Sequence, residues 1–338
     1  MKKSLKYLLL LLLSLTSVFF AEVIAGSYKY PLYEIWGIFV VIPLYGLHTI
    51  VLLYVIKKTL GNRKVMFASL YFAGTIFGLY EAYLTKVLWV GLSPDSLIVF
   101  HIAIIDFLVL VFFWHPLMSF IIPSLVFEGF MTKDNYLYEG LPEIVKKGLK
   151  NKKIRIPFLL LIGLAFSLNG ISPINVLKSG FANAIPILLF YYFLRKKDVH
   201  LKYSLKEILP NKNEFIIFNI LLFLMYIIMG NMIQRDVLTL INQIIIWVIY
   251  LLLAMLFYQK LKNNKLAEEY LVGEAVLNFN EMIIATILII ISGAIFSLDW
   301  IFGFRDVVMI VVYLAWAVSG SAIFWYTVIK KPIKRKTG

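Results

Sequence analysis

Apolar residues fill this chain in long runs, and short polar segments separate the runs. Most runs hold roughly 20 residues, the length with which a helix crosses about 30 Å of hydrocarbon. Strands of about ten residues with alternating polarity, the mark of a membrane barrel, are absent from the sequence. The pattern predicts an all-α, polytopic integral membrane protein with about ten transmembrane helices. We expect these near residues 7–25, 32–56, 65–83, 97–114, 156–169, 174–194, 215–233, 237–258, 282–298 and 307–329.

The apolar segment 117–131 does not fit this series. It is shorter than a comfortable span and contains Pro123, and the His115-Pro116 pair would end the helix before it. We therefore predict that residues 117–131 form a short re-entrant or interfacial segment. Such a segment needs protein or a cavity to cover its backbone, because hydrocarbon offers no hydrogen-bond partners.

Composition supports a membrane protein. Of the 338 residues, 61% are hydrophobic and 15% charged, and the mean hydropathy is +0.87. A soluble domain would carry about 25% charged residues. The chain has no cysteine, which excludes disulfides, thiolate nucleophiles and cysteine-based metal sites.

Positive charge predicts the orientation. The net charge is +14, yet the basic residues flank apolar runs and form no recognisable nucleic-acid module, so we expect no nucleic-acid partner. With the N-terminus inside and ten crossings, 28 of the 33 lysines and arginines fall on the inner side. This asymmetry predicts a cytoplasmic (inner) membrane protein with both termini cytoplasmic. Its expected partners are membrane lipids, with anionic headgroups at the cytoplasmic face.

Two readings of the N-terminus stay open. Residues 7–25 fit a first transmembrane helix, but the basic start and the small-residue end Val23-Ile24-Ala25 also fit a signal peptide. Cleavage would remove Glu22 from the mature protein.

Ionisable residues divide the chain. They concentrate in the apolar stretch 73–128, where each is costly and needs a partner, a cavity or a function. We therefore expect a polar-site membrane subdomain at 1–131, a basic cytoplasmic loop at 132–155, and a six-helix scaffold with a basic C-terminal tail at 156–338.

The candidate site lies in the outer leaflet. Helix positions bring Glu22, Glu34, Glu81 and His101 to similar depth, so we predict that they line one pocket with Glu81 at its centre. Gly74 and Gly78 share a helix face with Glu81, and such a small-residue seam lets another helix approach closely.

Further candidate binding residues lie on other faces and depths. Tyr45 and His48 share a stripe with Glu34, and His115 shares a face with Ser119. Lys86 either partners the site or extends to the outer interface. The complete set of candidate binding residues is Glu22, Glu34, Lys86, Asp106, His115, Ser119, Glu128, Tyr45 and His48, beside the candidate catalytic residues Glu81 and His101.

A cofactor is not identified by the sequence. Glu and His side chains at one depth could bind a divalent metal, but no HExxH or other metal-ligand spacing appears. Phosphate-binding and nucleophile-elbow motifs are also absent.

Several strings resemble an uncharacterised family of prokaryotic polytopic membrane proteins. They are FAEVIAGS at 20–27, PLYG at 43–46, FGLYEAYLTK at 77–86 and HPLMSFIIPSLVFE at 115–128. Members carry a Glu pair where this chain has Tyr80-Glu81, and the resemblance implies no known activity. The positions Glu81, Leu97-x-x-x-His101 and His115-x-x-x-Ser119 are also faintly similar to CAAX-type intramembrane proteases, whose pattern has a Glu pair, Phe for the leucine and Asn for the serine.

Three functions remain open. A membrane-embedded hydrolase acting on a lipid or a membrane-tethered peptide would use Glu81 as general base and His101 to orient water or stabilise an oxyanion. A proton- or cation-coupled transporter would carry protons or a cation on four acidic residues, Glu22, Glu34, Glu81 and Asp106. The third is a structural or assembly subunit. The hydrolase requires Glu81 within about one water of His101, in a pocket open to the outer leaflet. The transporter requires a path that links the outer cluster of Glu22, Glu34, Glu81 and His101 to His48 and His115 across the midplane.

Overall fold

The computed structural model describes residues 1–167, 172–232, 239–264, 278–298 and 305–329. The expected helix limits at residues 169 and 237, Arg235 and the basic tail after residue 329 lie outside these residues.

Eight helices in the described ranges are long and apolar enough to cross a membrane. This confirms the all-α, multi-pass architecture. The remaining two expected spans correspond to α3, Phe67–Gly78, and α9, Lys152–Ser167, which are shorter, with 12 and 16 residues. The count of ten crossings stays a prediction. The eight are Lys3–Val23, Gly37–Leu60, Ile104–Met131, Pro173–Lys196, Lys212–Met232, Leu240–Asn264, Phe279–Phe296 and Ile310–Ile329.

The separate segment expected at 117–131 is wrong. Residues Ile104–Met131 form one helix of 28 residues, built from α6 (Ile104–Val109), η3 (Leu110–Ile121) and α7 (Ile122–Met131). The η3 stretch is π-helical and contains Pro116. A widened turn accommodates the missing amide of proline, so His115-Pro116 does not end the helix.

The helix expected at 97–114 begins later than predicted. Residues Ile98–Val99 (β1) and Ile102–Ala103 (β2) pair as an antiparallel hairpin before α6 begins. The two residues between them, Phe100 and His101, both have positive φ angles of 49° and 62°. Positive φ at both central positions is the requirement of a two-residue hairpin turn of type I′. Because neither residue is glycine or asparagine, the sequence carries no recognisable signal for this turn.

Compactness divides the chain into two units, each drawn from three segments. These units are not the three segments that the sequence predicts, with limits at residues 131 and 155. That division by the location of ionisable residues stays a prediction. Unit 1 comprises residues 1–46, 122–209 and 271–310, and unit 2 comprises residues 47–121, 210–270 and 311–338.

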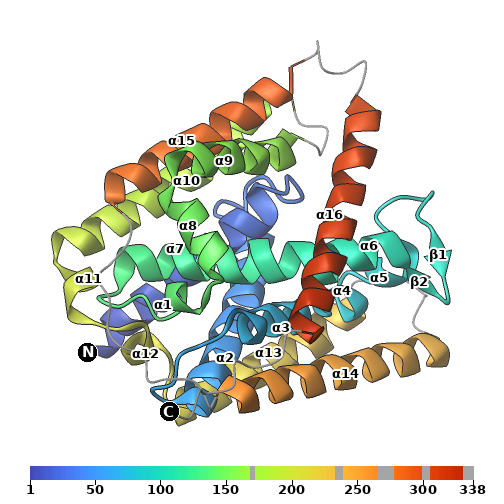
Figure 1. Cartoon of the computed structure of the whole chain (residues 1–338), viewed down its shortest axis with the longest axis horizontal. Coiled ribbons are helices and arrows are strands. Elements are labelled where there is room, and N and C mark those ends of the chain that lie inside the picture. Colours follow the sequence, from blue (N-terminus) through green and yellow to red (C-terminus); the bar gives the residue numbers. More distant parts are fainter. Residues whose placement is uncertain (168–171, 233–238, 265–277, 299–304, 330–338) are drawn as a thin grey trace, which may run out of the picture. The chain divides into compact units, whose positions relative to one another are not determined.

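Unit 1 is held by close helix contacts. In Figure 1, α9 and α15 (Phe279–Phe296) run side by side. A Cβ on Gly163 would lie 2.6 Å from the carbonyl oxygen of Ile289, so only glycine allows this approach. The other elements are α1 (Lys3–Val18), η1 (Phe19–Val23), η2 (Gly37–Val41), α7, η4 (Tyr138–Gly140), α8 (Glu143–Lys150), α10 (Pro173–Lys196), α11 (Val199–Lys202) and α12 (Leu205–Ile208).

Unit 2 is organised around α3, which packs against both η3 and α14 (Leu240–Asn264). The core here is unusually aromatic, with Tyr71, Phe72 and Phe77 fully buried on α3. Its other elements are α2 (Ile42–Leu60) from residue 47, α4 (Tyr80–Tyr83), α5 (Val87–Val90), β1, β2, α6, α13 (Lys212–Met232) and α16 (Arg305–Ile329) from residue 311.

Candidate functional site

A buried carboxylate–imidazole pair lies in unit 2. Nε2 of His115, on η3, is 3.1 Å from Oε1 of Glu81, on α4. The two residues are only 1% and 7% exposed. Burial away from water strengthens the interaction and makes each group depend on the other.

The glycine seam on α3 brings the pair together. A Cβ on Gly74 would lie 2.4 Å from Cα of Pro116, and one on Gly78 would lie 3.1 Å from Cβ of His115. The two backbones therefore approach as closely as only small residues permit. This confirms that the face carrying Gly74, Gly78 and Glu81 meets another helix.

Two hydroxyl groups extend the pair. Ser119 lies one turn beyond His115 and its Oγ is 3.0 Å from Nδ1 of the imidazole, which confirms that the two share a face. Thr85 donates a short hydrogen bond to the other carboxylate oxygen of Glu81. The result is a continuous hydrogen-bonded chain from Thr85 through Glu81 and His115 to Ser119.

A second histidine, His48, lies near the pair and shares an aromatic neighbour with His115. The imidazole of His48 stacks on Phe77 with ring centroids 4.6 Å apart, and Phe77 also stacks against His115 at 5.7 Å. Nε2 of His48 is 2.9 Å from the hydroxyl of Tyr226 on α13. Both histidines thus belong to one polar and aromatic cluster, in which all residues are buried except the half-buried Thr85 and Tyr226. We call it the relay cluster: His48, Phe77, Glu81, Thr85, His115, Ser119 and Tyr226.

His101 does not lie on a helix as predicted. It occupies the exposed turn of the β1–β2 hairpin, and no contact among the described residues joins it to Glu81. The imidazole beside Glu81 is that of His115.

Glu22 and Glu34 lie in unit 1. The carboxylate of Glu22 accepts hydrogen bonds of 2.5 Å from both Tyr45 and Ser27. That of Glu34 accepts one of 2.6 Å from Tyr28. Burial and the adjacent carboxylate of Glu34 raise the pKa of Tyr28 to about 12, so its phenol stays a donor. One pocket joining both residues to Glu81 and His101 stays a prediction.

Asp106 and Lys86 are both buried in unit 2, with exposed fractions of 4% and 5%. The carboxylate of Asp106 accepts a 2.6 Å hydrogen bond from Tyr313 on α16. Lys86 has a left-handed backbone with φ of 61° at the start of α5. The sequence left open that Lys86 extends to the outer interface, but its side chain is buried in unit 2.

Glu128 lies in unit 1, on α7, and is 1% exposed. Its carboxylate accepts hydrogen bonds from the backbone amides of Leu137, at 2.7 and 2.9 Å, and Tyr138, at 3.0 Å. These amides open the short η4 helix, so Glu128 anchors a loop after the long helix.

The described residues contain no group of three or more His, Asp or Glu side chains placed to hold a metal ion.

The sequence interpretation missed Tyr226 and Thr85. Tyr226 lies in an apolar run of the second half, where the sequence predicts only a helical scaffold. A tyrosine hydroxyl in such a run needs a buried partner, and that requirement was the available signal. Thr85 follows Glu81 by four residues, a spacing that places the two on one helix face.

Comparison with known proteins gives a family and no activity. A family model described as an uncharacterized membrane protein family matches residues 10–331. An uncharacterized protein from Archaeoglobus fulgidus is 31% identical over 250 residues, which cover 73% of this chain and 76% of the relative. No solved structure matches.

Proposed function

The chain belongs to this uncharacterized membrane protein family, and we propose that it is a proton-coupled transporter in which Glu81 and His115 bind the transported proton. The observation that carries the proposal is the 3.1 Å contact between Glu81 and His115, which lies on the candidate membrane span Ile104–Met131. Chains of Asp, Glu and His inside membrane proteins mark proton paths, because an ionisable group there is too costly to keep without a use.

The chemistry of the pair suits reversible proton binding. Imidazole is the side chain whose ordinary pKa lies nearest physiological pH, so it gains and loses a proton there readily. With Glu81 ionised, a proton arriving at His115 leaves a neutral pair in the low-dielectric interior, and its departure leaves one negative charge. That alternation of charge is what a transport cycle must couple to movement of its helices.

The relay cluster offers positions for the proton beyond the pair. Ser119 and Thr85 can each donate and accept a hydrogen bond, so they can pass a proton to and from the two ionisable groups. His48 lies across Phe77 and bonds to Tyr226. The contact between Glu81 and His115 supports a transporter, because it joins one residue of the predicted outer cluster to one of the two histidines that the path must reach. The proximity of Glu81 to His101 that the hydrolase requires finds no support among the described residues.

The test is a pH-jump measurement on protein reconstituted in a solid-supported membrane. Proton binding inside the membrane displaces charge and gives a transient current without any transported solute. The wild type should give this current, and Glu81→Gln and His115→Gln should remove at least most of it. Tyr71→Phe is the matched control, because it deletes a buried hydroxyl of the same unit, bonded to backbone carbonyls, and leaves the pair intact.

Equal charge movement in all four proteins would overturn the proposal. The structural or assembly subunit would then be the favoured function.

A hydrolase acting through a different set of residues is the second candidate. Ser119, His115 and Glu81 are linked in the order nucleophile, base and orienting carboxylate. Ser119 is fully buried, so a lipid or peptide substrate would need an opening in unit 2. Ser119→Ala separates the two functions. The substitution should abolish hydrolysis of a lipid ester or peptide substrate. It leaves Glu81 and His115 in place, so the total charge moved in the pH jump should persist even if the current becomes slower.

A further inference from the structure

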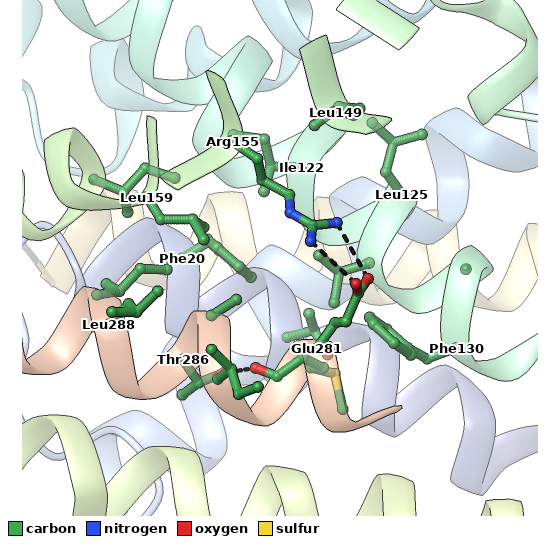
Figure 2. A pocket seen from close by; sticks show the side chains of 18 of the residues that line it. Phe20, Ile122, Leu125, Phe130, Leu149, Arg155, Leu159, Glu281, Thr286 and Leu288 are labelled. Carbon is green, nitrogen blue, oxygen red and sulfur yellow. Dashed lines mark hydrogen bonds and ion pairs between the residues drawn. The ribbon is translucent and has the colours of Figure 1, made fainter. Parts of the chain in front are cut away.

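A cavity of 610 Å³ lies within unit 1. Its volume falls within the range of about 300–1,000 Å³ that is usual for small-molecule sites. Helices α1, α7, α9, α10 and α15 and the π-helical turn η1 supply its walls, which are mostly apolar. Figure 2 shows Phe20, Leu125, Phe130, Leu159 and Leu288 around this space.

Charged side chains gather where the chain passes from α8 into α9. Lys150, Lys152 and Arg155 all line the cavity there. Arg155 binds Glu281 through two hydrogen bonds of 3.1 Å, so these two charges compensate each other (Figure 2). Lys150 and Lys152 are exposed, and neither forms an ion pair with the described residues.

The other acidic residue that lines the cavity, Glu128, is held by hydrogen bonds from the backbone. Glu128 accepts hydrogen bonds from two backbone amides and is almost fully buried. Two lysine ammonium groups therefore provide the uncompensated charge beside an apolar chamber. That combination suits an amphiphile with an anionic head and a hydrocarbon tail.

The neighbouring helix α8 resembles an interfacial helix. It places lysines beside Ile144, whose side chain is 81% exposed. Short amphipathic segments of this kind lie at the level of lipid headgroups. In the orientation that the charge asymmetry predicts, this end of the cavity faces the cytoplasmic headgroups, where anionic lipids attract lysine.

From these observations we infer that unit 1 binds an anionic membrane lipid, with its headgroup at Lys150 and Lys152 and an acyl chain inside the cavity. The site is independent of the relay cluster, and its occupancy does not require proton movement. A lipid held at this position would contact α1, α7, α9, α10 and α15 together and stabilise their packing.

The experiment measures lipid binding to the full chain in nanodiscs, by native mass spectrometry after release. Discs contain phosphatidylcholine with a small fraction of phosphatidylglycerol. The wild type should retain phosphatidylglycerol selectively, and the Lys150→Gln/Lys152→Gln variant should bind it roughly 30-fold more weakly, about fivefold for each lysine. The matched control is Lys147→Gln/Lys153→Gln, two exposed lysines of the same helices that do not line the cavity.

A second variant tests the chamber. Ala285→Trp fills space in the cavity wall without changing charge and should also remove selective retention. An equal loss in the Lys147→Gln/Lys153→Gln control would show that binding follows general surface charge, and would overturn the proposal. Undiminished binding in the folded Ala285→Trp protein would place the lipid outside the cavity and overturn it as well. If Ala285→Trp fails to fold, the comparison of the two lysine pairs still decides.

Discussion

Two buried carboxylates show how the surroundings of a side chain determine its use. Glu81 in unit 2 and Glu128 in unit 1 are 7% and 1% exposed. Glu128 accepts hydrogen bonds from backbone amides, which cannot take up or release a proton near neutral pH. Glu81 faces the imidazole of His115, a side chain that exists in neutral and protonated forms. Burial alone therefore does not identify a functional acid in a membrane protein, and the titratable partner is the more informative observation.

The largest effect on stability should come from Glu128→Ala. The substitution leaves the buried amide of Leu137 and the half-buried amide of Tyr138 without their acceptor, at a cost of about 1–3 kcal/mol for the first and somewhat less for the second. We expect the free energy of unfolding to fall by about 2–5 kcal/mol. Chemical unfolding in mixed micelles measures it, with the exposed Glu143→Gln as the control. Unchanged stability would show that Glu128 is not the loop anchor.

Gly74→Val should both destabilise unit 2 and separate the proton-binding pair. The added Cβ would lie 2.4 Å from Cα of Pro116, and overpacking of this kind costs about 1–3 kcal/mol. Gly230→Ala is the control, since a Cβ there has its nearest neighbour 3.8 Å away. The midpoint temperature of thermal unfolding should fall in Gly74→Val and stay unchanged in Gly230→Ala. A Gly74→Val protein with wild-type stability and pH-jump current would contradict the close helix approach.

Much of the fold follows from the sequence, because membrane helices are specified by local properties. Length and hydropathy located the spans, and the Gly74-Gly78-Glu81 spacing predicted a close helix contact. His115 and Ser119 were also placed on one face. These features depend only on the helical period, which a single segment contains.

The relay cluster could not be fully predicted, because its partners come from distant segments. Tyr226 meets His48 across 178 residues, and no local pattern marks that pair. The hairpin at Phe100 and His101 was missed because its left-handed residues are not those that normally signal a turn. The break expected at Pro116 was wrong because a π-helical stretch accommodates the proline.

Tyr226→Phe should give a smaller effect on stability. It removes the hydroxyl that bonds to His48 and keeps the ring, so the expected loss is about 1 kcal/mol. A thermal unfolding comparison with Tyr71→Phe would measure it. If His48 takes part in proton movement, the pH-jump current should also slow in Tyr226→Phe alone. Equal kinetics in both variants would exclude His48 from the path.

The smallest effect concerns a further carboxylate of unit 1 held by the backbone. Glu207 accepts a hydrogen bond from the amide of Ser204, which lowers its pKa below the ordinary value of 4.5. A lowered pKa stabilises the folded state above pH 4.5, and this contribution is lost as pH falls through the folded value. Amide exchange in α12, corrected for intrinsic rates, should therefore accelerate below pH 4.5. Glu207→Gln should show no such change. The same pH dependence of exchange in both proteins would show that the hydrogen bond from Ser204 to Glu207 does not stabilise α12.

Infrared difference spectroscopy across a pH step tests the central comparison most directly, since it reports the charge state and the hydrogen bonding of individual carboxyl groups. We expect a carboxylate difference band in the wild type, from Glu81 as His115 gains its proton, that is absent in Glu81→Gln, shifted in His115→Gln and unaltered in Glu128→Gln. A band that persists in Glu81→Gln, or one that disappears in Glu128→Gln, would contradict the assignment of proton binding to Glu81 and His115.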